Sequence, residues 1–231
     1  MTLGRPRAHW RVTDSTNERA RELAAAGAPH GTLVTADEQT AGRGRQGRRW
    51  TAPPGSAVLM SLVLREFRPD LPLAAAVAVC EACECHASSL PCAIKWPNDI
   101  WVEERKLAGI LIEGRPQEGW AVLGIGLNVD IDEDEFPPEL RDIATSLLLG
   151  QGAPPIEDMV QGITRTLEAR LETSEAEVLT AWRARDALRG REVRWADGSG
   201  TAAGIDDSGA LLVETGDGRV TLDAGEIHLL R

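Results

Sequence analysis

The run "CAIKWPNDIWVEERKLAGILIE", residues 92–113, is rich in β-forming residues and is broken only by short polar turns. A second run of the same character, "GWAVLGIGLNVDI", follows at residues 119–131. Because so little chain separates the strands, we predict that they form an antiparallel meander. This meander is the expected centre of an α+β domain.

Helices and further strands are expected on both sides of the meander. "DSTNERARELAAAG", residues 14–27, contains a capping box in Ser15 and Glu18, which is typical of a helix start. Strands are expected at 31–39 and after Gly55. Other helical patterns cover 71–88, about 156–171 and about 175–187. We therefore predict a mixed or antiparallel sheet packed on helices.

The character of the chain changes near Gly190. From there on, short alternating runs are separated by Asp-Gly and Ser-Gly turns, and no helical pattern is present. This predicts four or five short strands in a small β-barrel. We expect two domains, at residues 1–187 and 188–231.

The composition excludes several classes of protein. The 231 residues carry a formal net charge of −11, which argues against a general nucleic-acid-binding protein. No segment approaches the roughly 18 consecutive apolar residues of a membrane span, and no apolar run follows the first charges. We expect a cytoplasmic protein without a membrane partner. The only lysines are Lys95 and Lys106, in a chain that otherwise uses arginine, so both are candidates for a specific role.

The four cysteines are Cys80, Cys83, Cys85 and Cys92. Three of them fall in an Ala-rich expected helix, where Cys85 would point away from the other two. The glycine-containing knuckles typical of zinc-binding cysteines are absent from this stretch. We therefore favour buried reduced thiols over a zinc site.

Positive charge is concentrated in "GRGRQGRRW", residues 42–50. The pattern G-x-G-x-x-G is present, but "RRWTAPPGS" follows it and cannot open the helix that a dinucleotide fingerprint requires. Three glycines and four arginines make this loop costly to order without a counter-ion, so we expect it to be mobile when empty and to close on anions. A solvated loop paired with the protein's own carboxylates is the alternative.

Six motifs, taken in order and spacing, resemble those of the biotin protein ligases. They are "DSTN" at 14–17, "EQTAGRGRQGRRW" at 38–50, "KWPNDI" at 95–100, "KLAGILIE" at 106–113, "GIGLNV" at 124–129 and "GEIHLL" at 225–230. The resemblance covers nearly the whole chain. It implies a class II synthetase-like catalytic domain followed by an SH3-like barrel. Because "DSTN" begins fourteen residues in, we expect no winged-helix domain and no DNA partner.

The resemblance also implies an activity. Biotin and ATP are the expected substrates, with Mg²⁺ and without a tightly bound prosthetic group. Biotin would be activated as biotinoyl-AMP and transferred to a lysine of a biotin carrier domain of a carboxylase. A homodimer and a monomer both remain open. The alternatives are a lipoate or octanoate ligase or transferase of the same fold, and a nucleic-acid-binding module built on the Arg-Gly loop.

Site residues follow from the motif matches. Lys106 and Arg43 are the expected catalytic residues. The expected biotin-binding residues are Ser15, Thr16, Asn17, Gln39, Gly42, Arg43, Gly44, Arg45, Lys106, Gly109, Gly124 and Gly126. The expected ATP-binding residues are Arg45, Arg48, Trp50, Lys95, Asn98, Asp99 and Asn128, and Asp99 is also the candidate magnesium ligand. Purely structural roles remain open for four of them: helix capping for Ser15, packing for Trp50 and turn support for Lys95 and Asn98.

Overall fold

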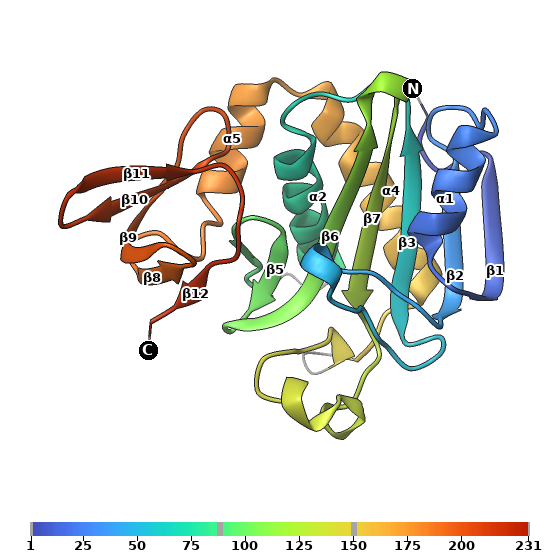
Figure 1. The fold of residues 1–231 in the computed structure, drawn as a ribbon. Helices are drawn as coiled ribbons and strands as arrows, with labels where there is room; N and C mark the ends of the chain where they lie inside the picture. Colours follow the sequence, from blue (N-terminus) through green and yellow to red (C-terminus); the bar gives the residue numbers. More distant parts are fainter. Residues whose placement is uncertain (1, 87–89, 149–151, 231) are drawn as a thin grey trace.

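The computed structural model describes residues 2–86, 90–148 and 152–230. Its centre is a seven-stranded sheet with the strand order β1-β2-β3-β7-β6-β5-β4 (Figure 1). The four consecutive strands β4 to β7 pair antiparallel with one another, so the predicted meander is confirmed. The strands are β1 (Arg7–Thr13), β2 (Leu33–Gln39), β3 (Ala57–Leu64), β4 (Ala93–Lys95), β5 (Asp99–Val102), β6 (Arg105–Arg115) and β7 (Trp120–Asn128).

Strand β1 was not among the strands predicted from the sequence. It lies at the edge of the sheet, runs parallel to β2, and so makes the sheet mixed. Within it only Thr13 is buried, and Arg7 and Arg11 are exposed. An edge strand that buries so little carries no clean apolar alternation, which is why its sequence does not indicate a strand.

Helices cover both faces of the sheet. Helix α1 (Thr16–Ala25) packs against β2, β3 and β7, whereas α2 (Leu71–His86) and α4 (Ile156–Glu172) lie together on the opposite face (Figure 1). Helix α2 is buried on almost every side because alanine lets neighbouring elements approach closely. The last part of the predicted helix 71–88 falls outside the described residues. None of the helices in the described segments is long and apolar enough to cross a membrane.

Helix α5 (Glu175–Arg183) is shorter than the predicted helix 175–187. The backbone after it turns to pair with β4: Ile94 donates to the carbonyl of Arg185 at 2.7 Å, and Ala187 donates to that of Ile94 at 3.0 Å. Sheet-like pairing therefore replaces the last helical turn. This tertiary contact has no counterpart in the local sequence pattern.

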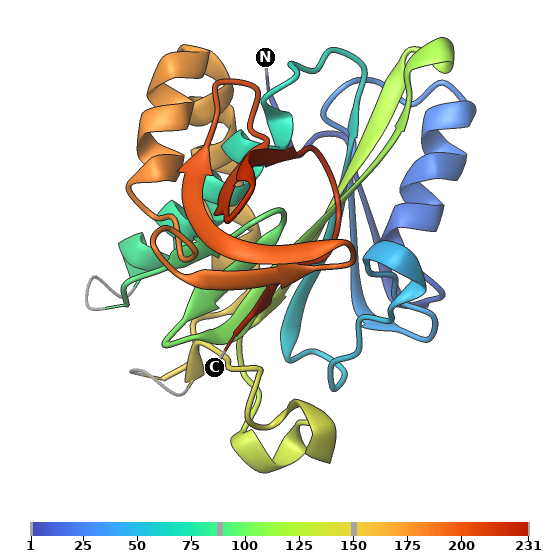
Figure 2. The same ribbon diagram turned by 60° about the vertical axis from the view of Figure 1, so that its left-hand side comes forward.

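The C-terminal part is a second, five-stranded sheet with the order β11-β10-β9-β8-β12, curled on itself (Figure 2). Its strands are β8 (Glu192–Trp195), β9 (Gly198–Ile205), β10 (Leu211–Thr215), β11 (Gly218–Leu222) and β12 (His228–Leu229). It attaches to the main domain through the buried Trp96, whose indole nitrogen donates to the carbonyl of Gly209 at 3.0 Å. An α+β domain followed by a small β domain is the predicted fold class, which is confirmed.

The cysteines separate as the helical period predicts. Cys80, Cys83 and Cys92 are buried as free thiols where α2 packs against β4, and Cys85 is exposed. Burial and contact with Cys92 raise the pKa of Cys80 and Cys83, with the hydrogen bond to Cys92 as the larger cause.

Candidate active site

Every site residue predicted from the sequence, except Gly42, lines one cavity of about 540 Å³. This volume is in the range of small-molecule binding sites. The cavity lies against β6 and β7 and is bordered by the start of α1, the end of β2 and residues 42–50, which we call the flap. Gly42 lines an adjoining hollow on the other side of the flap.

One end of the cavity is built from uncharged polar groups at the start of α1. The backbone nitrogen of Thr16 donates to Gln39 Oε1 at 2.7 Å, which joins α1 to the end of β2. Ser61 on β3 lies with its hydroxyl 2.8 Å from Thr16 Oγ1 and 2.6 Å from Asn17 Oδ1. Thr16, Asn17 and Ser61 are all buried, so this network is rigid before any ligand arrives.

Three glycines on the central strands make room for these side chains. A Cβ on Gly124 would lie 2.0 Å from Asn17 Oδ1, and a Cβ on Gly126 would lie 2.5 Å from the Trp50 ring. Gly109 pairs with Gly126 across β6 and β7 and also faces Trp50, at 3.2 Å from its Cβ position. The two strands therefore form a floor without side chains, on which the Trp50 indole lies.

Charged groups occupy the other end. Lys106 Nζ on β6 lies 2.7 Å from Asp99 Oδ1 on β5 and 5.8 Å from the centre of a Trp50 ring. Lys95 lies over the Trp101 ring at 5.0 Å. Burial lowers the pKa of Lys95, and the nearby Lys106 lowers it further, while Asp99 opposes both effects. Both lysines of the chain therefore reach this cavity.

Arg45 and Asn98 tie the flap to the turn between β4 and β5. Arg45 Nη1 donates to Asn98 Oδ1 at 3.2 Å, and Asn98 Nδ2 donates to the carbonyl of Ile110 at 2.8 Å. Burial lowers the pKa of Arg45. Asn98 thus has the turn-supporting role that the sequence left open, and it also holds a flap arginine.

The remaining flap arginines are paired with the protein's own groups. Arg43 lies 3.1 Å from Glu18, Arg48 lies 2.8 Å from Glu226, and Arg49 donates to the carbonyl of Thr40 at 2.8 Å. The ion pairs are largely exposed, and such pairs contribute at most about 1 kcal/mol each. The alternative of internal pairing is therefore realised in this structure.

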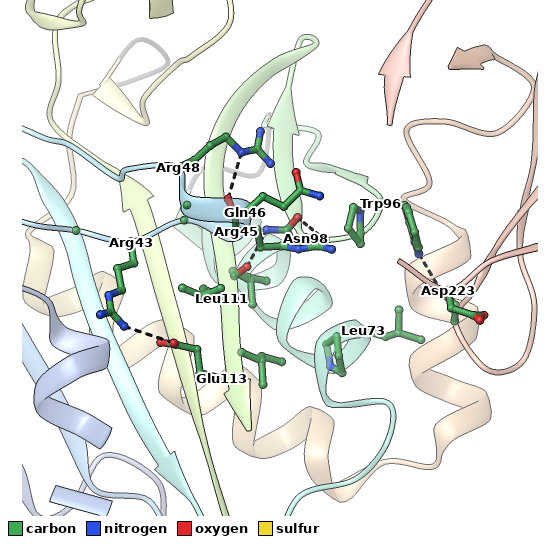
Figure 3. A pocket seen from close by; sticks show the side chains of 18 of the residues that line it. Arg43, Arg45, Gln46, Arg48, Leu73, Trp96, Asn98, Leu111, Glu113 and Asp223 are labelled. Atoms are coloured by element: carbon green, nitrogen blue, oxygen red, sulfur yellow. Dashed lines mark hydrogen bonds and ion pairs between the residues drawn. The ribbon is translucent and has the colours of Figure 1, made fainter. Parts of the chain in front are cut away.

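A wider hollow of about 900 Å³ lies on the outer side of the flap (Figure 3). Its walls come from the flap, the start of α2, residues 96–98, residues 110–113 of β6 and the connections at 208–210 and 223 between strands of the C-terminal sheet. Figure 3 shows Arg43 turned away from Arg45 and Asn98, toward Glu113 at the far end of β6. Five flap residues line both hollows, so the flap is the partition between them: Arg43, Gly44, Arg45, Arg48 and Arg49.

Several lining residues were missed in the sequence. Phe136, Leu140, Ile143 and Ala144 follow the last strand of the sheet and close the cavity from the outside. Two backbone hydrogen bonds hold this segment to Lys106. The backbone nitrogen of Lys106 donates to the carbonyl of Ile143 at 2.7 Å, and the backbone nitrogen of Thr145 donates to the carbonyl of Lys106 at 2.9 Å. These residues lie in "DEDEFPPELRDIATS", whose irregular pattern resembles an ordinary surface loop.

Asn128 lines the cavity, but part of its amide is already engaged. Its Nδ2 donates to the carbonyl of Thr145 at 2.9 Å and so fastens the same segment to the end of β7. The structure gives Asn128 a supporting role, and its predicted contact with adenine stays a prediction.

Comparison with known proteins identifies related families. Residues 10–130 match the model of the "Biotin/lipoate A/B protein ligase family", and residues 189–230 match the "Biotin protein ligase C terminal domain". The two matches cover the large mixed sheet and the small curled sheet in turn.

Individual relatives agree with the family models. The chain is 40% identical to the bifunctional ligase/repressor BirA of Bacillus subtilis, over 94% of this chain and 72% of that protein. It is 36% identical to the biotin--[acetyl-CoA-carboxylase] ligase of Mycobacterium tuberculosis, over 95% of this chain and 87% of that protein. Its structure resembles the biotin protein ligase of Aquifex aeolicus in complex with biotin and ATP, with a TM-score of 0.86, 29% identity and coverage of 98% and 99% of the two chains.

Proposed function

This chain belongs to the biotin/lipoate A/B protein ligase family, and from that premise we propose how its cavity carries out the ATP-dependent ligation of biotin to a carrier protein. In the first step a biotin carboxylate oxygen attacks the α-phosphorus of ATP, and pyrophosphate leaves. In the second step a carrier lysine amine attacks the acyl carbon of biotinoyl-AMP, and AMP leaves. The carrier domain of a biotin-dependent carboxylase is the acceptor.

The observation that carries this assignment is the division of one cavity into an uncharged polar end and a cationic end. Ser15, Thr16 and Asn17 offer polar groups to the uncharged head of biotin, Gln39 orients its carboxylate end, and Lys106 faces the reacting carboxylate. Two anionic reagents repel each other in the first step, so fixed positive charge between them lowers the barrier. Lys106 supplies that charge from a position held by Asp99 at 2.7 Å.

The flap supplies the remaining charge and excludes water. Arg43 and Arg45 exchange their internal partners for carboxylate and phosphate oxygens when substrate binds. Charge-assisted bonds of about 1.5–3 kcal/mol offset the loss of the ion pair between Arg43 and Glu18 and of the hydrogen bond between Arg45 and Asn98. Trp50 lies on the Gly109–Gly126 floor and provides a stacking surface for adenine. Once the flap is closed, the mixed anhydride is protected from hydrolysis.

Magnesium accompanies ATP in this proposal. Among the described residues, no three or more acidic, histidine or cysteine side chains gather into a metal-binding cluster. The single carboxylate of Asp99 fits an ion held mainly by triphosphate oxygens and water, which is the usual state of Mg²⁺ on nucleotides. When bound, the ion neutralises phosphate charge.

The test is biotin-dependent release of pyrophosphate, followed by biotin transfer to a purified carrier domain. We expect Lys106→Ala and Arg43→Ala to lower kcat/KM about 100-fold or more, because each removes charge that stabilises the transition state. Arg165→Ala, which removes an exposed arginine on α4, is the matched control and should leave the rate unchanged. Pyrophosphate release by Lys106→Ala at the wild-type rate would contradict the assignment.

The two alternatives are not favoured. The named relatives are biotin ligases, and the C-terminal match is to a biotin protein ligase domain, not to a lipoate enzyme. The nucleic-acid module would need a broad basic face, whereas this chain has a net charge of −11 and two of its flap arginines, Arg43 and Arg48, face acidic side chains of the protein. Competition between biotin and lipoate in an equilibrium binding measurement distinguishes a biotin ligase from a lipoate enzyme.

A further inference from the structure

Glu113 is the last residue of the motif "KLAGILIE" and lies outside the predicted set of catalytic and binding residues. It lies near the end of β6, between α1 and the flap, with its side chain 29% exposed. Its two carboxylate oxygens face different partners. Oε2 faces the polar end of the cavity, and Oε1 faces arginines of α1 and the flap.

Toward the cavity, Glu113 determines how the Asn17 amide is turned. Asn17 Nδ2 donates to Glu113 Oε2 at 2.8 Å. A carboxylate only accepts hydrogen bonds, so the amide cannot flip without setting oxygen against oxygen. The Oδ1 atom is thereby directed to the buried Ser61 hydroxyl at 2.6 Å and lies over Gly124. From Ser61 the network continues through Thr16 to Gln39, so one carboxylate orients the whole polar end.

Toward the flap, Glu113 is a counter-ion. Oε1 lies 3.6 Å from Arg43 Nη1 and 3.7 Å from Arg21 Nη1, and Glu18 Oε2 lies 3.1 Å from the same Arg43 atom. Figure 3 shows the Arg43 side chain extended toward Glu113. Glu18 and Glu113 thus hold Arg43, which the proposed reaction requires beside the substrate carboxylate and phosphate.

We propose that Glu113 is a positioning residue that couples biotin binding to flap closure. It orients the Asn17 amide toward the biotin head, and it pairs with Arg43 until substrate anions take its place as the partner of that arginine. This inference rests on the proposed function. Glu113 touches neither the reacting carboxylate nor phosphate in this role. Its effect on biotin passes through Asn17, and its effect on the flap passes through Arg43.

Three substitutions separate the two roles. Glu113→Ala removes both. Glu113→Gln keeps a carbonyl oxygen that accepts from Asn17 but removes the charge facing Arg43. Glu18→Gln removes charge facing Arg43 without touching Asn17. Glu22→Gln is the matched control, because Glu22 also lies on α1 and pairs with an arginine, Arg19 at 2.7 Å, away from the cavity.

The two readouts are the biotin Kd from titration calorimetry and the rate of tryptic cleavage within residues 42–50 of the unliganded protein. We expect Glu113→Ala to raise the biotin Kd at least tenfold, while Glu113→Gln stays within about threefold and Glu18→Gln does not weaken binding. Glu113→Ala, Glu113→Gln and Glu18→Gln should each speed cleavage about two- to fivefold, and Glu22→Gln should change neither value. A merely structural role would lower thermal stability without this split.

The outcomes are distinguishable. If the wild-type protein does not bind biotin, the proposed function fails and this inference fails with it. If wild type binds and Glu113→Ala binds equally well, with both proteins folded by circular dichroism, only the positioning role of Glu113 is overturned. Unchanged flap cleavage in Glu113→Gln and Glu18→Gln would overturn the counter-ion role.

Discussion

Two glycines of β7 lie where an added side chain would collide with residues of the cavity. Gly124 and Gly126 lie two positions apart and point to the same face of the sheet, one under Asn17 and the other under Trp50. A methyl group at Gly124 overlaps an atom that Glu113 and Ser61 hold in place. At Gly126 it overlaps an aromatic ring, which can move only by leaving the floor of the cavity.

From this difference we predict distinct kinetic effects. Gly124→Ala should raise the KM for biotin at least tenfold, and Gly126→Ala should raise the KM for ATP by a similar factor, because each displaces the group that contacts that substrate. Gly162→Ala is the control: its Cβ would lie 3.8 Å from Ala82, and in the middle of α4 the change should stabilise the fold by about 0.5–1 kcal/mol. Initial rates measured with biotin and ATP varied in turn give the two KM values. If either substitution raised both KM values equally, the assignment of Gly124 to the biotin side and Gly126 to the ATP side would be contradicted.

At the scale of elements, the flap is a short irregular segment held at several points. It contains one turn of 3₁₀ helix, Arg45–Gly47, with Gln46 at a φ of 54°. Its arginines are partnered by α1, by the turn after β4 and by Glu226 of the C-terminal part. The expectation that the empty flap is mobile stays a prediction, because internal pairing gives it a resting position without showing how long it stays there.

Ligand protection tests flap closure directly. We expect trypsin to cut the unliganded protein within residues 42–50, and biotin with ATP to slow that cleavage at least tenfold, since closed arginines are buried against phosphate and carboxylate. Mass spectrometry of the first fragments identifies the cut. A carboxylate-free biotin analogue with ATP serves as the comparison. Equal cutting with and without saturating substrates would rule out closure.

Helix α1, which carries the polar end of the cavity, is anchored by Asp14. Its carboxylate accepts from the Ser15 backbone nitrogen at 2.6 Å and pairs with Arg19 at 2.7 Å. The hydrogen bond with Arg19, more than any other contact, lowers the pKa of Asp14 to about 2. The stabilisation is therefore complete above the ordinary pKa of about 4 and is lost as the pH falls through 2.

Asp14→Asn should reproduce this dependence. Because the Asp14 side chain is 43% exposed, solvent screens the pair, and we expect a loss of under about 1 kcal/mol of unfolding free energy at pH 7. The difference from wild type should shrink as the pH is lowered from 4 toward 2. Urea unfolding at pH 7, 4 and 3 measures it, with Asp197→Asn in a surface turn as the control. A constant difference over that range would show that Asp14 acts only through its shape.

On the scale of the whole molecule, the cavity is completed by parts far apart in sequence. His228 and Leu229 reach it from β12 and Glu226 from the segment before that strand, while four residues between 136 and 144 line another wall. Trp96, inside the "KWPNDI" motif, is buried, donates to the carbonyl of Gly209 and also lines the wider hollow beside the flap. The small sheet is thus part of the wall of the site and not an independent appendage.

The sequence by itself determined the elements and the chemistry. The meander, a helix within residues 14–27 and the C-terminal strands are visible as local patterns, because apolar period and turn residues act over a few positions. The cavity residues from Ser15 to Asn128 follow from the motif matches to a family and not from local patterns. The predicted capping box is wrong in one respect: Ser15 is the N-cap of α1, but its side chain makes no capping hydrogen bond. Strand β1 and the end of α5 are not visible as local patterns. Their backbones are paired by partners distant in the chain, which no local pattern records.

Only the tertiary structure decided which partner each charged group takes. Nothing in "EQTAGRGRQGRRW" indicates that Arg43 faces Glu18 and Glu113, or that Lys106 faces Asp99. Nor does the motif "KLAGILIE" reveal that its final glutamate orients Asn17. The type of a residue limits which groups its side chain is able to bind. Electrostatic and hydrogen-bond energies also depend on the distance between the groups and on their burial, and the fold sets both.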